Sequence, residues 1–179
     1  MTLGVIPAVI EALQEATRDW PLTDRAGTLI FDEMSLKENL QYDSKHDIVM
    51  GFFDSGTQTT PAVANSAPLI LVAGISKTWI KPVAYTVSRT KAAADTLHDL
   101  FITLIKQLQG IQFFVKAFIC DQGGSNITVG NKLAVTFEEP FFVLEGRKIY
   151  FLYDTPHLLK CKRNILRSTS QAPCWATNC

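Results

Sequence analysis

The sequence predicts an α/β fold: a mixed β-sheet flanked by helices, with antiparallel strands first and parallel β-α-β units later. Three observations support this prediction. Strand-like apolar runs cluster in the first half of the chain, at residues 28–34, 48–54, 68–75 and 81–88. A long amphipathic stretch then leads directly into another apolar run, which is typical of a parallel crossover. Helical and strand-like patterns alternate from there to residue 167.

Length and composition fit one globular domain. The chain has 179 residues, of which 47% are hydrophobic and 19% are charged, and its formal net charge is +0. Such a chain can bury a substantial core, and its apolar share is too high for a disordered segment. The neutral balance argues against a protein that binds polyanions over its whole surface, although it is compatible with a local basic patch.

The sequence indicates an intracellular protein without a membrane segment. Its longest apolar runs, residues 67–75 and 111–120, are far shorter than a membrane span. The N-terminal stretch lacks the basic front and the small-residue cleavage site of a secretory signal. The cysteines show no spacing typical of metal sites or disulfides, so nothing requires an oxidising compartment. They are Cys120, Cys161, Cys174 and Cys179.

The N-terminal third is expected to hold one helix and two strands. Apolar residues at helical spacing predict a helix over residues 5–18. Residues 28–34 and 48–54 are rich in β-branched and aromatic side chains, as strands are. A polar turn at 38–47 separates these two runs, which are close enough in sequence to form an antiparallel hairpin. The small polar residues 55–67 indicate a surface loop.

The middle of the chain contains the clearest helix. Residues 68–75 and 81–88 read as strands, joined either by a turn or as one bent strand. Residues 91–109 carry a broad apolar stripe at helical spacing, and Gly110 follows as an expected cap. The strand at 112–121 comes directly after that helix.

The C-terminal third repeats the alternation. A short helix is expected to begin with Ser125 or Asn126 as its cap, and residues 141–154 end in another buried strand. Residues 155–167 form a helix with Thr155 as the cap and Pro156 in its first turn. No internal repeat or domain boundary is visible. We therefore divide the chain into an N-terminal helix and lead-in (1–27), a core (28–167) and an irregular tail (168–179).

Three of the predicted strands end in aspartate, at Asp32, Asp121 and Asp154. If those strands lie side by side and run in one direction, the three carboxylates gather at one edge of the sheet, where open α/β sheets bind their ligands. Clustered carboxylates repel one another unless a cation neutralises them, and Mg²⁺ prefers such oxygen ligands. The alternative is that each aspartate simply opens a turn.

Long motifs in the chain resemble the P-element-type transposase family, which includes the THAP-domain transposases. These motifs are "GTLIFDEMSLKENLQYDSKHDIVMGFFDSG", "FICDQGGSN" and "YFLYDTPHLLKCKRN". The resemblance runs from about Thr28 to Asn164 and covers most of the chain. It implies an RNase H-like catalytic core that cuts and joins DNA with Mg²⁺ in the nucleus. It further implies DNA as a partner, and a second copy or an intact transposase as another.

The resemblance also implies roles for individual residues. Asp32 matches the first metal-binding acid of the family, and Asp121 in "CDQGGSN" matches the second. Asp154 matches the acid of the family's D-x-P-H-L-x-K segment, for which we expect a supporting role. In the family a third acid follows further along the chain, after a guanine-nucleotide-binding insertion. The sequence shows neither this acid nor a THAP-type zinc finger, so we expect a truncated transposase with an incomplete active site.

Two alternatives to a catalytic fragment remain open. The chain is then either a non-catalytic module that binds DNA or protein and acts as a repressor, or a nuclease that recruits another acid. Glu138 and Glu139 are the candidates for that acid, but neither lies in a helical pattern. Glu33 adjoins Asp32 but points to the opposite face of a strand, so we assign it a structural role.

The predicted C-terminal helix supplies further candidates. His157 follows Asp154 closely and could donate a hydrogen bond to that carboxylate or to a phosphate, although a helix start is also an ordinary place for histidine. Lys160, Lys162 and Arg163 make the helix basic. They form either a solvated helix face or a contact with DNA phosphates, which supply affinity without reading sequence.

Overall fold

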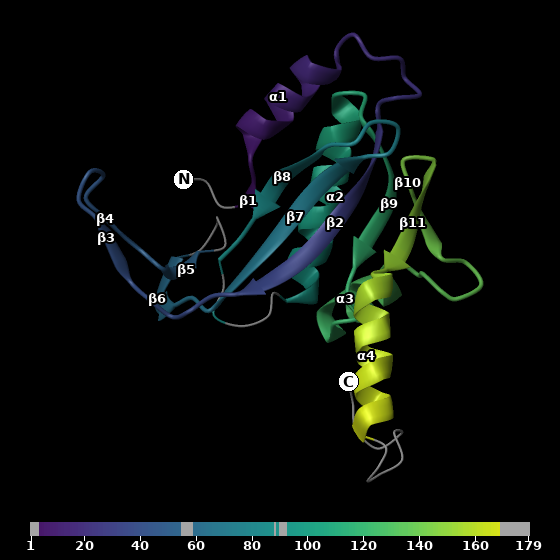
Figure 1. Ribbon diagram of the computed structural model, residues 1–179. Coiled ribbons are helices and arrows are strands. Elements are labelled where there is room, and N and C mark those ends of the chain that lie inside the picture. Colours follow the sequence, from purple (N-terminus) through teal and green to yellow (C-terminus); the bar gives the residue numbers. More distant parts are fainter. Residues whose placement is uncertain (1–3, 55–58, 88, 90–92, 169–179) are drawn as a thin grey trace.

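A computed structural model of the chain describes residues 4–54, 59–87, 89 and 93–168. Neighbouring strands of its central seven-stranded sheet follow in the order β1 (Gly4–Val5), β8 (Ile80–Tyr85), β7 (Ser66–Gly74), β2 (Ala26–Ser35), β9 (Phe114–Cys120), β11 (Arg147–Tyr153) and β10 (Phe141–Leu144) (Figure 1). The pairs β2–β9 and β9–β11 are parallel, and the other neighbouring pairs are antiparallel. The predicted mixed sheet is therefore confirmed.

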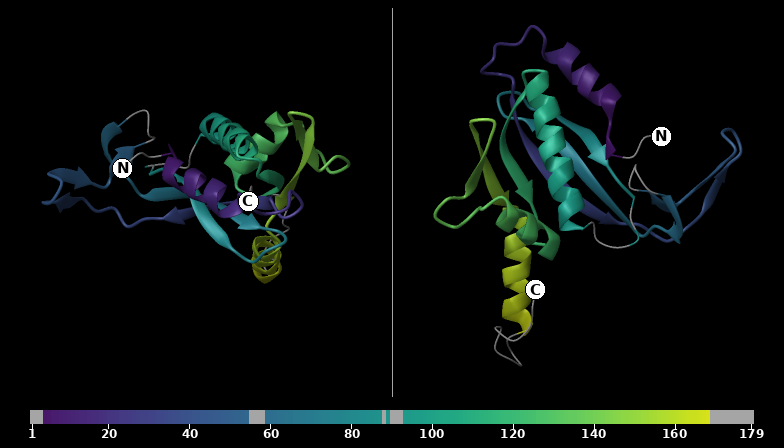
Figure 2. Two further views of the ribbon diagram at one scale, coloured as in Figure 1. Left: turned by 90° about the horizontal axis from the view of Figure 1, so that it is seen from above. Right: turned by 180° about the vertical axis from the view of Figure 1, so that it is seen from behind.

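Helices flank this sheet. They are α1 (Pro7–Thr17), α2 (Ala94–Gly110), α3 (Gly124–Lys132) and α4 (Thr155–Ser168). Seen along the sheet, α2 and α3 lie on one side of it, whereas α4 lies on the other side and projects away from the strand ends (Figure 2). Among the described residues, no helix has both the length and the apolar character needed to cross a membrane.

The core forms where α2 packs on the central strands. The buried side chains of α2 recur at helical spacing, as the sequence predicts, and include Leu97, Phe101, Leu104, Ile105 and Leu108. Phe101 lies between the two parallel strands, with ring centroids 5.5 Å from Phe31 of β2 and 4.3 Å from Phe118 of β9. This contact holds α2 across the β2–β9 pair, so the connection from β8 to β9 returns beside β2.

The predicted strand at residues 48–54 is not part of the central sheet, and the hairpin with residues 28–34 does not form. Strand β2 instead pairs along its length with β7, from Gly27 opposite Gly74 to Ser35 opposite Ser66. Residues 48–54 divide at Gly51, whose φ of 109° favours glycine. The first part, β4 (Ile48–Met50), pairs with β3 (Gln41–Asp43), and the second, β5 (Phe52–Asp54), pairs with β6 (Thr59–Val63).

Other boundaries also differ from the predictions. Residues 59–63 of the expected loop 55–67 form β6, and residues 55–58 lie outside the described residues. Helix α4 begins at Thr155, but its first hydrogen bond runs from the Leu158 N–H to the Asp154 carbonyl. Asp154 rather than Thr155 therefore occupies the cap position. Helix α4 extends to Ser168, and the rest of the predicted tail, residues 169–179, lies outside the described part of the chain.

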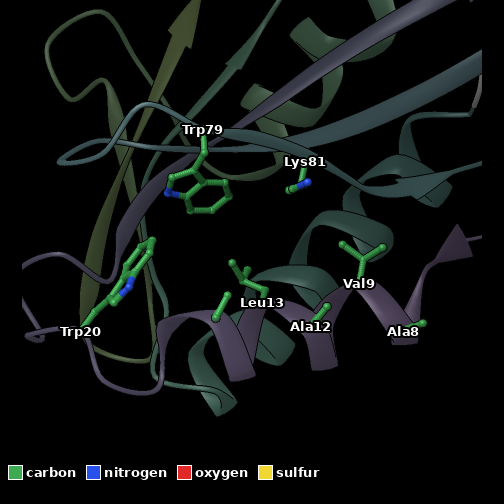
Figure 3. Close-up of a pocket in the computed structure, with 8 residues that line it drawn as sticks. Ala8, Val9, Ala12, Leu13, Trp20, Trp79 and Lys81 are labelled. Carbon is green, nitrogen blue, oxygen red and sulfur yellow. The ribbon is translucent and has the colours of Figure 1, made fainter.

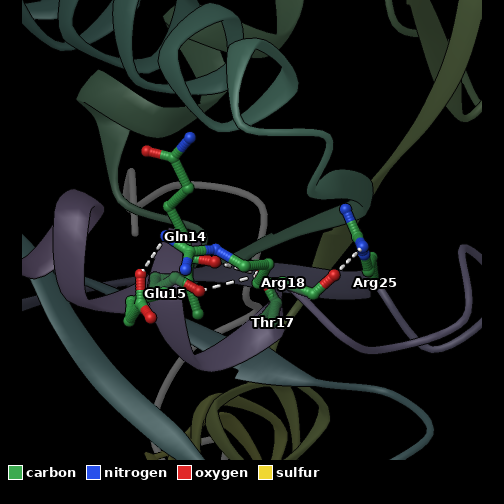
Figure 4. A network of polar contacts seen from close by, with 6 residues as sticks. Gln14, Glu15, Thr17, Arg18 and Arg25 are labelled. Carbon is green, nitrogen blue, oxygen red and sulfur yellow. Dashed lines mark hydrogen bonds and ion pairs between the residues drawn. The ribbon is translucent and has the colours of Figure 1, made fainter.

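Arg25 joins the N-terminal segment to the central sheet, and Figure 4 shows its contact with the Arg18 carbonyl. The Arg25 guanidinium donates to the carbonyls of Trp20 (3.0 Å) and Arg18, and to Gln112 Oε1 (2.9 Å) beside β9. At the end of α1, Arg18 pairs with Glu15 and the Thr17 hydroxyl donates to the Leu13 carbonyl. These bonds fix the chain between α1 and β2, directly before the first parallel strand.

The contact of Phe101 with both parallel strands gives a stability prediction. Replacing the buried Phe101 by alanine leaves a cavity beneath β2 and β9, so Phe101→Ala should lower the free energy of unfolding by about 3–5 kcal/mol. The matched control is Phe137→Ala, because Phe137 is 96% exposed, and it should change stability by less than about 0.5 kcal/mol. Urea denaturation measures both variants. Similar small losses would contradict the proposed packing.

Candidate functional site

The carboxyl ends of three neighbouring strands meet at one edge of the sheet. Strand β2 continues to Ser35, but its pairing with β9 ends where Ile30 lies opposite Ile119, and Asp32 and Asp121 each follow two residues later. Tyr153 of β11 lies opposite Cys120, and the next N–H, that of Asp154, donates to the Cys120 carbonyl (2.8 Å). Because paired strands lie about 4.8 Å apart, this register places the three aspartates side by side along the edge.

The alternation of side chains places these aspartates on the sheet face opposite α2. Phe31 and Cys120, the residues before Asp32 and Asp121, are buried on the α2 side. Phe151 of β11 is also buried against Phe118, whereas Leu152, two residues before Asp154, is 43% exposed. The three aspartates therefore start from the same, more open face. Asp32 is exposed, and Asp121 and Asp154 are half-buried.

A bulge in β9 sets this orientation for Asp121. Gly27 lies opposite Val115 but Thr28 lies opposite Ala117, so Lys116 has no partner on β2. The extra residue lets Val115 and Phe118, three positions apart, both point into the core. Without the bulge, strict alternation of side chains from Val115 would place Asp121 on the buried face. The extra residue shifts the alternation by one, so Asp121 lies on the opposite face.

The carboxylate of Asp121 is held by two donors from the turn that follows β9. The Gly123 N–H donates to Asp121 Oδ1 at 3.0 Å, and Asn126 Nδ2 donates to the same oxygen at 2.6 Å. Within the described part of the chain, no hydrogen bond reaches the other oxygen, Oδ2. Asp121 therefore uses Oδ1 to bind its own turn, and Oδ2 is left for a ligand outside the turn.

Asp32 is less constrained. Its Oδ1 accepts the Glu33 N–H at 2.9 Å. Glu33 itself bonds across to β7, where the Ser66 hydroxyl donates to Glu33 Oε1 at 2.6 Å. The neighbouring acids Asp32 and Glu33 thus have separate surroundings.

Carboxylates at the strand edge are the candidate metal ligands among the described residues. Among them, no group of three or more histidine, cysteine, aspartate or glutamate side chains is arranged to hold a metal ion. Two carboxylates on adjacent strand ends nevertheless fit Mg²⁺, which is usually bound through one or two carboxylates and keeps several waters. Asp32 and Asp121 are the residues that would hold it.

The sequence-predicted residues of α4 are exposed. His157 lies in the first turn, and within the described residues it forms no hydrogen bond or ion pair with Asp154. Lys160 and Arg163 are three positions apart and share one side of the helix, whereas Lys162 points to another side. The helix projects beyond the sheet edge with these cations exposed (Figure 1).

The hydrogen bonds from Asn126 and Gly123 to Asp121 were not predicted from the sequence. The prediction that Ser125 or Asn126 caps the short helix is wrong, because α3 begins at Gly124 with Gly123 at the cap position. The Asn126 side chain turns back to Asp121 instead of capping the helix. The available signal was its spacing, since an amide five residues after a strand-ending acid can return to it across the first turn of a helix.

A cavity lies apart from the aspartate edge. It has a volume of about 460 Å³, and α1 forms one wall while Trp79 and Lys81 form the other (Figure 3). Trp20 closes one end, with its ring 6.3 Å from that of Trp79. No sequence-predicted site residue lines this cavity.

The buried thiol beside the aspartate edge is kept neutral. Burial raises the pKa of Cys120 to about 12, and the negative charge of Asp121 contributes to the same shift. Burial also raises the pKa of Tyr153, with a smaller contribution from Cys120. The α2 side of the edge therefore carries neutral groups, and the charge lies on the opposite face.

Comparisons with known proteins agree with this architecture. The profile of the TNP-like, RNase H N-terminal domain family matches residues 1–134. The transposable element P transposase of Drosophila melanogaster is 28% identical over 144 residues, and DNA transposase THAP9 of Homo sapiens is 25% identical over 155 residues. Each match covers 79% of this chain, which spans only 17% of either relative.

A solved structure is also similar. It is a Drosophila P element transposase strand transfer complex, which matches with a TM-score of 0.72 and 27% sequence identity. The match covers 92% of this chain and 34% of the solved chain. The resemblance seen in the sequence motifs is therefore confirmed.

The burial of Cys120 gives a prediction of thiol reactivity. In a variant with Cys161, Cys174 and Cys179 replaced by serine, Cys120 should stay unlabelled by a thiol reagent at about pH 8, because only the thiolate reacts and the folded thiol is protonated there. Denaturant should make it react at the rate of a free cysteine. Rapid labelling of the folded protein would contradict the described packing.

Proposed function

The chain belongs to the TNP-like, RNase H N-terminal domain family, and on that premise we propose that it carries two metal-binding acids of a transposase catalytic core, Asp32 and Asp121. The observation that supports this most strongly is the strand register, which brings the two acids together at the ends of adjacent parallel strands. Residues 28–167 form this core in our proposal, and residues 1–27 lead into it.

The proposed chemistry is cleavage and joining of DNA strands. A bound Mg²⁺ would neutralise the charge that develops on the attacking and leaving oxygens of a phosphodiester. The protein's proposed part is to hold the two carboxylates beside each other on neighbouring strands, so that they need not reorganise when charge develops. Asp154 supports the edge through its backbone bonds to β9 and α4.

DNA is the proposed macromolecular partner, and the nucleus is the proposed location. Lys160, Lys162 and Arg163 lie exposed on α4, which extends from the edge that carries the aspartates. Such cations attract the phosphate backbone without reading sequence. We propose that His157, exposed in the first turn of the same helix, donates to a phosphate. An intact transposase or a second copy of this chain is the further proposed partner.

We propose that this chain alone has little or no strand-cleaving activity. Of the three aspartates at the strand edge, only Asp32 and Asp121 are proposed as ligands, and among the described residues no group of three or more acids, histidines or cysteines is arranged to hold a metal ion. The alternative function is a non-catalytic module that binds DNA or an intact transposase and represses it. The exposed basic helix favours this alternative, because α4 can contact DNA whether or not metal binds.

Metal titration tests the two acids. Calorimetry with Mn²⁺ should show weak binding by the wild type, reduced about tenfold or more in Asp32→Asn and Asp121→Asn, because each loses a charged ligand. Asp19→Asn, which removes an exposed acid of the N-terminal segment, is the control and should bind as the wild type does. Equal and negligible binding by all four proteins would favour the repressor module.

Nuclease assays test the proposed inactivity. The purified chain with Mg²⁺ should not nick supercoiled DNA measurably above the Asp32→Asn variant, because two acids form an incomplete site. Robust nicking that Asp32→Asn abolishes would show that the chain recruits another acid.

Salt-dependent DNA binding tests α4. Replacing Lys160, Lys162 and Arg163 together by alanine should weaken binding to any DNA sequence and reduce the slope of log affinity against log salt by up to about 3, near 0.9 for each lost phosphate contact. Lys106→Ala removes an exposed cation of α2 and should leave the slope unchanged. An unchanged slope in the triple variant would exclude α4 from the DNA interface.

A further inference from the structure

We propose that Asn126 is a positioning residue that fixes the Asp121 carboxylate with Oδ2 turned toward the ligand; this inference rests on the proposed metal-binding role of Asp121. Asn126 is the third residue of α3 and is only 2% exposed. Its Nδ2 lies 2.6 Å from Asp121 Oδ1 and 3.4 Å from the Asp121 carbonyl oxygen. One amide group thus bonds both the side chain and the backbone of the acid.

The chemistry of this pair fixes which way the amide faces. An ionised carboxylate can only accept hydrogen bonds, so the Asn126 NH₂ must point to Asp121. Asn126 Oδ1 consequently points into the interior, where it has no hydrogen-bond partner among the described residues. A buried polar atom without a partner destabilises a fold. The Asn126 oxygen therefore does not stabilise the fold. We infer that the amide is present because its NH₂ group orients the Asp121 carboxylate.

A second donor completes the arrangement. The Gly123 N–H bonds the same oxygen, Oδ1, at 3.0 Å. A Cβ atom at position 123 would lie 3.0 Å from Asp121 Oδ1, tighter than most such contacts, so glycine lets the backbone approach the carboxylate. Two donors on Oδ1 hold the carboxylate against rotation and leave Oδ2 as the atom presented at the strand edge.

The Asn126 side chain bonds the turn that carries Asp121 and does not cap its own helix. Asn131, near the other end of the same helix, is exposed and serves as a matched position where an asparagine makes no such contact. Partners that orient a metal ligand typically change metal affinity 10- to 100-fold when they are removed.

The test separates stability from metal binding. Asn126→Leu keeps the number and branching of the side-chain heavy atoms, with bulkier methyl groups, and removes both the donor and the unpartnered oxygen, so the variant should still fold and unfold near the wild-type temperature. Mn²⁺ affinity measured by calorimetry on the folded protein should nevertheless fall about tenfold. Asn131→Leu should change neither quantity. Wild-type Mn²⁺ affinity in folded Asn126→Leu would overturn the proposal. A drop in affinity that is fully accounted for by a smaller fraction of folded protein would also overturn it.

A metal-free measurement keeps this inference distinct from the proposed function. In an NMR spectrum without metal, the Asn126 side-chain NH₂ should show a downfield proton that Asp121→Ala abolishes and Asp32→Ala leaves in place. An Asn126 amide signal that is unaffected by Asp121→Ala would overturn the positioning role, whatever the metal titration gives. If the signal behaves as expected but the wild type and Asp121→Asn bind Mn²⁺ equally, the metal site fails while the orienting contact stands.

Discussion

The parallel pairing of β9 with β2 on one side and β11 on the other is the constraint on which the rest of the structure depends. Helix α2 connects β8 to β9 and crosses the sheet past β7 and β2, so that β9 enters beside β2. The rings of Phe31, Phe101 and Phe118 hold that crossover against both strands. Because parallel strands end at the same edge, residues about 90 and 30 positions apart in sequence, Asp32, Asp121 and Asp154, become neighbours.

The parallel pairing determines the edge of the sheet at which the acids lie. The bulge at Lys116 determines the face of the sheet from which Asp121 projects. With it, Cys120 points toward α2 and its thiol stays neutral, while Asp121 turns to the open face. Gly123 and Asn126 then fix one oxygen of Asp121. Strand register and bulge thus determine where the Asp121 backbone lies and which face its side chain leaves. The turn then determines the orientation of its carboxylate oxygens.

The long patterns of the sequence were sufficient to predict the mixed sheet, helix α2 and the strand that stops directly before Asp121, whereas β2 continues past Asp32 to Ser35. These features depend on local periodicity and on the apolar runs that must be buried. The pairing of residues 48–54 was not predictable in this way, because β2 can pair with either neighbour in sequence and the choice depends on which partner buries its alternate side chains. β7 does so through Ile70 and Val72, which are fully buried, whereas Ile48 and Val49 stay exposed. The amide of Asn126 was missed because a polar residue near a helix start ordinarily caps that helix, and only tertiary geometry shows it turned toward Asp121.

We propose that Asp32 and Asp121 hold one divalent cation between adjacent strands. The most direct measurement is anomalous diffraction from crystals of this chain soaked in Mn²⁺. The account predicts an anomalous peak between the two carboxylates, bonded to Asp121 through Oδ2 while Oδ1 keeps its bonds to Gly123 and Asn126. A manganese ion bound elsewhere with no peak at this edge, or electron density that places the two aspartates on different edges of the sheet, would contradict it.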